Sequence, residues 1–171
     1  MLCRLFLLFT AAVTLFAQSG LPTITSEVKQ NYTRTKDLIL RSADKMPEDG
    51  YNMKATPQER TWAEILNHIS QAHAMVCGGI FGQPGRANTT KTAKADVIAE
   101  LKKSFEICDR AYDFLNESNA SLVGGSEYIG GTMVGRLYAN VIHDNEMYGT
   151  MVVYLRLKGI VPPSSEARTG R

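Results

Sequence analysis

The sequence predicts an all-α fold, a single four-helix bundle. Three observations support this prediction. Four long segments repeat their apolar residues at intervals of three and four, no segment alternates apolar and polar residues as a strand would, and stretches rich in proline or glycine separate the four. The segments are residues 25–46, 56–80, 94–116 and 132–158. Four helices of about twenty residues pack most simply as an antiparallel-type bundle.

The first two helices have recognisable ends. Pro47 ends the first, because proline cannot donate the backbone hydrogen bond that a continuing helix needs. The second is expected to begin in residues 56–59, where Thr56 and Glu59 have the spacing of a capping box and a proline would occupy the first helical position. Its apolar stripe then continues to Ile80.

Two histidines lie on this second helix. His73 replaces an apolar residue within the stripe, so we interpret it as a core histidine. His68 lies on the flank of the stripe, about 140° around the helix from His73. The two should therefore not bind one ion from a regular helix, although either could meet His143 across the bundle.

The fourth helix carries apolar residues on two sides. At about 100° per residue, one side contains Val134, Tyr138, Val141, Tyr148, Val152 and Leu155. The side nearly opposite contains His143, Met147, Met151 and Tyr154. A helix that is apolar most of the way round is buried on most sides. We therefore expect His143 to face protein or a cleft, where it needs a hydrogen bond, a metal ion or a substrate as partner.

Several polar residues lie near His143 on the fourth helix. Arg136 and Tyr154 share the His143 side of the helix and could orient an anionic ligand. A long arginine on a helix is more often solvated, so we expect Arg136 at the rim. Asp144, Asn145 and Glu146 form a polar step directly after His143. Asn145 lies toward the first apolar side, where a hydrogen bond to an adjacent helix gives it a structural role by default.

The N-terminus has the layout of a secretory signal peptide. Arg4 precedes an apolar run that is too short to span a bilayer and is followed by small and polar residues. Cleavage is expected after Ala17, which assigns residues 1–17 to the signal peptide, residues 18–163 to the bundle domain and residues 164–171 to a polar C-terminal tail. The alternative is an uncleaved N-terminal anchor. No second apolar segment is long enough to predict a membrane span.

Charge and motifs exclude several function classes. The chain has 19 basic and 17 acidic residues and no basic cluster, so it offers no electrostatic footprint for nucleic acid. It contains no glycine-rich phosphate loop, no serine nucleophile elbow and no metalloprotease helix motif. The catalytic residues, if there are any, are therefore unknown from the sequence.

Two cysteines lie on predicted helices. Cys77 is near the end of the second helix and Cys108 is in the apolar stripe of the third. In an exported protein such a pair favours a disulfide, and the alternative is two small buried thiols. Neither cysteine has the neighbours that would make it a credible nucleophile.

Four stretches together resemble the DinB-like family of bacterial four-helix proteins: RTWAEILNHI, SFEICD, HDNEMYG and YLRLKGIVPPSS. The similarity covers residues 25–165 in the order and spacing of these stretches. It implies a four-helix bundle with up-up-down-down topology and one long crossover. It also implies a bacterial protein, secreted or periplasmic if the leader is cleaved, that could form homodimers.

The resemblance further implies a metal pocket. Members typically bind a divalent metal, zinc or nickel, through three histidines, two of which match His68 and His143, whereas Met147 stands at the third position. The pocket could have lost its ion, with Met147 as packing. A divalent ion could instead bind weakly, helped by water, Glu64 or Glu146. As the least favoured option, Met147 could complete a copper site, because a thioether suits Cu(I) better than zinc or nickel.

Two function classes follow. The first is an exported binding protein that keeps the bundle without its chemistry and takes an unknown small molecule. The second is a divalent-metal-dependent enzyme, similar to the thiol transferases among the relatives or to a hydrolase. The missing third histidine favours the first class, and so does export, because cytosolic thiol cofactors lie on the other side of the membrane.

Overall fold

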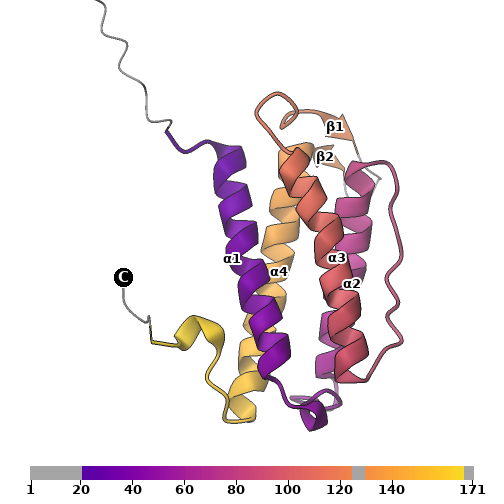
Figure 1. Cartoon of the computed structure of the whole chain (residues 1–171), viewed down its shortest axis with the longest axis vertical. Helices are drawn as coiled ribbons and strands as arrows, with labels where there is room; N and C mark the ends of the chain where they lie inside the picture. The colour runs from indigo at the N-terminus through magenta and orange to yellow at the C-terminus, as the bar shows by residue number, and fades with distance from the viewer. Residues whose placement is uncertain (1–20, 125–129, 168–171) are drawn as a thin grey trace, which may run out of the picture.

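The computed structural model describes residues 21–124 and 130–167, and its four helices pack side by side (Figure 1). They are α1 (Ile24–Lys45), α2 (Trp62–Ile80), α3 (Lys94–Phe114) and α4 (Met133–Leu157). Two 3-10 turns, η1 (Glu48–Gly50) and η2 (Pro163–Ser165), and a two-stranded antiparallel hairpin, β1 (Val123–Gly124) and β2 (Gly131–Thr132), complete the described elements. The four-helix bundle is therefore confirmed. The predicted signal peptide lies outside the described residues.

The start of α2 differs from the prediction. The capping box is formed by Thr61 and Glu64, with the Glu64 carboxylate 2.6 Å from the Thr61 backbone N and the Thr61 hydroxyl 3.1 Å from the Glu64 backbone N. Thr56 and Glu59 instead form a turn, closed by a 3.1 Å backbone hydrogen bond. A backbone bridge between Lys54 and Thr61 encloses this turn and delays the helix by about one and a half turns.

The helix directions also differ from the expected order. The disulfide Cys77–Cys108 joins the C-terminal parts of α2 and α3, which run parallel, while α1 and α4 run the other way (Figure 1). The order is thus down-up-up-down, and the implied up-up-down-down order is not seen. The cause is the position of the one long crossover. Residues 81–93 carry the chain back along the whole of α2, so α3 repeats its direction.

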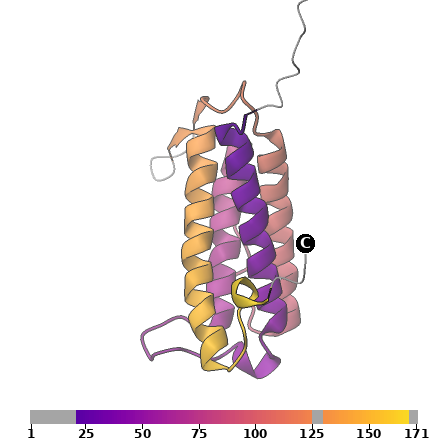
Figure 2. The same cartoon turned by 90° about the vertical axis from the view of Figure 1, so that its left-hand side faces the viewer.

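The buried face of α4 lies between the two apolar sides that the sequence suggested. α1 runs beside α4, and the other two helices lie behind them (Figure 2). Arg136, Asn140 and Asp144 share this buried face with apolar residues, whereas Tyr138, assigned to an apolar side, is 52% exposed. Polar residues at the centre of the face split its apolar pattern into two stripes.

The chain continues to pack beyond the expected domain boundary at residue 163. The backbone N of Ser164 donates to the Tyr148 hydroxyl at 3.0 Å, and the carboxylate of Glu166 pairs with Arg41 and Lys45 of α1. The first residues of the polar tail therefore fasten α4 to α1. None of the described helices is long and apolar enough to cross a membrane.

Candidate functional site

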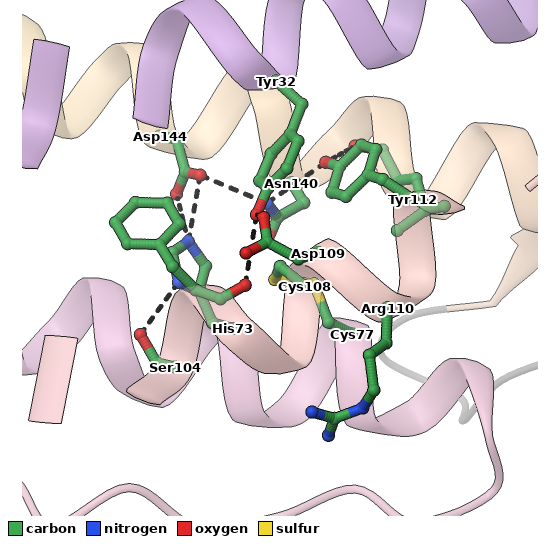
Figure 3. Close-up of a disulfide and its surroundings, with 12 residues drawn as sticks. Tyr32, His73, Cys77, Ser104, Cys108, Asp109, Arg110, Tyr112, Asn140 and Asp144 are labelled. Atoms are coloured by element: carbon green, nitrogen blue, oxygen red, sulfur yellow. Dashed lines mark hydrogen bonds and ion pairs between the residues drawn. A yellow bond between two sulfur atoms is a disulfide. The ribbon is translucent and has the colours of Figure 1, made fainter. Parts of the chain in front are cut away.

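A disulfide fixes one end of the α2–α3 pair. Cys77 and Cys108 are fully buried, their Cα atoms lie 5.0 Å apart, and their sulfur atoms are bonded (Figure 3). The bond lies one turn after His73 on α2 and one turn after Ser104 on α3. It therefore holds the two helices that support the polar cluster described next.

His73 is a core histidine, as the sequence predicted. It is fully buried, with Nδ1 3.0 Å from the Ser104 hydroxyl and Nε2 3.0 and 3.1 Å from the two carboxylate oxygens of Asp144 (Figure 3). Serine, histidine and aspartate are the residue types of a hydrolytic triad. Ser104 and Asp144 are, however, 3% and 1% exposed, so a substrate cannot reach the hydroxyl. The cluster is structural.

Asp144 connects this buried cluster to the surface. Asn140 donates an amide hydrogen bond to its carboxylate at 3.2 Å, and Nδ1 of His143 lies 3.5 Å from it. Burial alone would raise the pKa of Asp144, but its interactions with His73 and His143 outweigh burial and lower it. The sequence marks Asp144 only as part of a polar step after His143 and does not predict this link. The four-residue spacing of Asn140 and Asp144 on one helix face was the available indication.

The structure brings His68 and His143 together. Their Nε2 atoms lie 3.1 Å apart and their ring centroids 5.0 Å apart, with His68 on α2 and His143 on α4. Both side chains are half-buried. Partial burial, the nearby charge of Arg60 and the neighbouring His143 lower the pKa of His68, while Glu146 opposes them. An N–H on one of these nitrogens can donate to the other.

Two cavities meet at His68. An apolar groove of about 370 Å³ between α2 and α4 is lined by His68, Gln71, Ala72, Met75, Val76, Ala139, Asn140 and His143. A more polar cavity of about 530 Å³ is lined by Lys54, Gln58, Glu59, Arg60, Glu64, Asn67, His68, Gln71 and Thr89. His68 and Gln71 border both, and each volume is of the size that small ligands occupy, roughly 300–1,000 Å³.

The other candidate ligands do not converge on the histidine pair. Met147 is half-buried, packs against the hydrophobic core and does not line the groove. The Glu64 carboxylate is engaged in the α2 cap, and Glu146 is exposed. Within residues 21–124 and 130–167, no three side chains of the His, Cys, Asp and Glu types form a group that could hold a metal ion.

The donor set fits a metal only in part. Two imidazoles bound to one tetrahedral zinc at about 2.0–2.1 Å have nitrogens about 3.3 Å apart, close to the observed 3.1 Å. The same distance also suits an N–H···N hydrogen bond. Because a third protein ligand does not reach the pair among the described residues, these side chains do not complete a firmly bound metal centre.

Two further residues on the His143 side of α4, Arg136 and Tyr154, are buried. Arg136 is 6% exposed, so the expectation of a solvated rim position is wrong, and desolvation lowers its pKa. Gly124 of the hairpin lies against its guanidinium and helps to cover it. Tyr154 is buried, and its hydroxyl donates to the Arg60 carbonyl. That contact fixes the Arg60 backbone beside His68.

Comparisons with known proteins agree with this architecture. No protein-family model and no curated protein matches the sequence. The chain is similar in structure to a DinB-like protein from Bacillus cereus, with 16% identity and a TM-score of 0.66, over 80% of this chain and 93% of that one. It is similar as well to a DinB-like protein from Bacillus subtilis, with 17% identity and a TM-score of 0.63, over 84% of this chain and 99% of that one. The chain therefore has the fold of DinB-like proteins.

Proposed function

We propose that this chain is an exported small-molecule-binding protein built on the DinB-like bundle, with a degenerate histidine-based pocket. The observation that carries the proposal is the half-buried pair of His68 and His143 at the side of an apolar groove, without a third converging ligand. An apolar groove with a few convergent polar groups is the usual form of a ligand site. In this proposal the pair recognises the ligand by hydrogen bonding, and a metal binds weakly or not at all.

Export is part of the proposal. The apolar N-terminal run with its single arginine supports it, and so does the disulfide between Cys77 and Cys108, since such bonds persist mainly in oxidising compartments. N-terminal sequencing of protein secreted by a bacterial host tests it. Mature protein beginning at or near residue 18 is expected, and an intact N-terminus would contradict cleavage.

The test of the pocket is bound metal, measured by elemental analysis on protein purified without a histidine tag. Wild-type protein, dialysed after incubation with zinc, is expected to retain much less than one equivalent. The variant Met147→His places a third imidazole one helical turn after His143 and should retain close to one equivalent. Met147→Leu is the matched control and should behave as wild type.

One outcome would overturn the proposal. If wild-type protein keeps one equivalent of zinc, nickel or copper after dialysis, and His143→Ala loses it, the pocket is a functional metal centre. That result would favour the second candidate, a divalent-metal-dependent thiol transferase or hydrolase. The specific observation behind this candidate is the 3.1 Å separation of the two Nε2 atoms, which suits two ligands of one ion.

A further inference from the structure

We propose that the ligand of this site is an anionic amphiphile, with an apolar chain in the α2–α4 groove and a carboxylate head beside Arg60, past His68. This inference deepens the proposed function and rests on it. It starts from the two cavities, which share His68 and Gln71 and therefore adjoin each other at these side chains. A ligand that crosses this border meets different chemistry at its two ends.

The groove provides the apolar end. Ala72, Met75 and Val76 of α2 face Ala139 of α4 across it. Met75 is 42% exposed, although burial of such a side chain is favourable by about 25 cal/mol per Å² of apolar surface. A narrow hydrocarbon chain would cover these residues, and no charged group of the groove opposes it apart from the titratable histidines.

The second cavity provides the charged end. Arg60 and Lys54 line it, and the described residues form no ion pair with either side chain. Glu59 and Glu64 also line it, but the Glu64 carboxylate is already held by the backbone at the start of α2. The lining thus carries two cations and two carboxylates, and the hydrogen bond from the Thr61 backbone N–H and the charges of Lys54 and Arg60 all lower the pKa of Glu64.

Arg60 is well placed for a head group next to His68. Its backbone carbonyl accepts the hydroxyl of buried Tyr154, which anchors the residue while its guanidinium stays exposed. Arg60 also has a larger electrostatic effect on His68 than Glu146 does. A carboxylate there can accept a two-pronged hydrogen bond from the arginine guanidinium.

Calorimetric titration with three ten-carbon probes tests the inference: decanoate, 1-decanol and decylammonium, each below its micelle concentration. Decanoate is expected to bind most tightly. Arg60→Gln should weaken decanoate about tenfold, the usual effect of losing one charged hydrogen bond, and leave decanol unchanged. Arg110→Gln is the matched control, because Arg110 is exposed on α3 and lines neither cavity. Met75→Gln should weaken all three probes alike.

The outcomes separate the two proposals. If decanol or decylammonium binds as tightly as decanoate and Arg60→Gln has no effect, the anionic head is wrong, while the groove remains a ligand site. If no probe binds wild-type protein that is folded by circular dichroism, both this inference and a binding role for the groove fail. Because the tested side chains are exposed, loss of folding does not confuse the result.

Discussion

Removing the disulfide is the perturbation whose effect on the stability of the fold is most predictable. Cys77 and Cys108 are 31 residues apart in the sequence. In the chain-entropy treatment, closing a loop of that length in the unfolded chain stabilises the folded state by about 3.7 kcal/mol at 25 °C. For a domain of this size, that corresponds to a fall in Tm of roughly 7–15 °C.

The assay is thermal unfolding followed by circular dichroism, on protein that lacks residues 1–17. Two samples are compared with the oxidised protein: the same chain denatured, reduced and refolded in reductant, and the double variant Cys77→Ala/Cys108→Ala. The reduced wild type loses only the cross-link, whereas the variant also loses two buried sulfur atoms, so its Tm should be slightly lower again. Reduction must include unfolding, because both cysteines are fully buried.

Two results would refute this reasoning. One is the titration of two free thiols in the denatured, unreduced protein, which would mean that no bond forms. The other is a Tm that changes by less than about 2 °C on reduction, which would mean that the unfolded chain is already restricted or that the cross-link strains the folded state.

Three further predictions concern the helix cap and the buried cluster. Thr61→Ala should lower the free energy of unfolding in urea by about 1 kcal/mol, whereas Thr56→Ala, in the turn before it, should have almost no effect. His73→Leu and Asp144→Leu should each cost about 3–5 kcal/mol by leaving a buried partner unpaired, and the double variant should cost less than their sum. The pKa of Asp144 is lower in the folded than in the unfolded chain. The ionised carboxylate therefore stabilises the fold fully above about pH 5, and this stabilisation is lost as the pH falls through the unfolded and then the folded pKa. Asp144→Asn should accordingly flatten the acid side of a plot of urea midpoint against pH.

The sequence predicts the elements of this fold better than their arrangement. Apolar spacing places all four helices within a few residues, except at the start of α2. There two Thr-x-x-Glu patterns follow each other closely, and only the bridge between Lys54 and Thr61 decides between them. The direction of a helix depends on where the preceding connection ends. The composition of residues 81–93 does not predict that this connection runs back along α2.

The sequence predicts single residues of the candidate site, but not the contacts between helices that decide the roles of the others. The resemblance selects His68 and His143, and the structure places them together. It does not reveal Asp144, because the role of that residue depends on His73 from a different helix. The same is true of Arg60, whose position beside His68 depends on a backbone contact with Tyr154 at the far end of α4.

The buried cluster also explains how the two histidine rings are oriented. His143 contacts Asp144, and Asp144 is held in turn by His73 and Asn140. If Nδ1 of His143 donates to that carboxylate, its Nε2 is left as an acceptor that points toward His68, whatever else occupies the site. The orientation of the pair therefore has a cause within the core and does not require an ion. The orientation of the two imidazoles is in this protein a consequence of how α4 packs, and a ligand that offers a hydrogen-bond donor can use them as they stand.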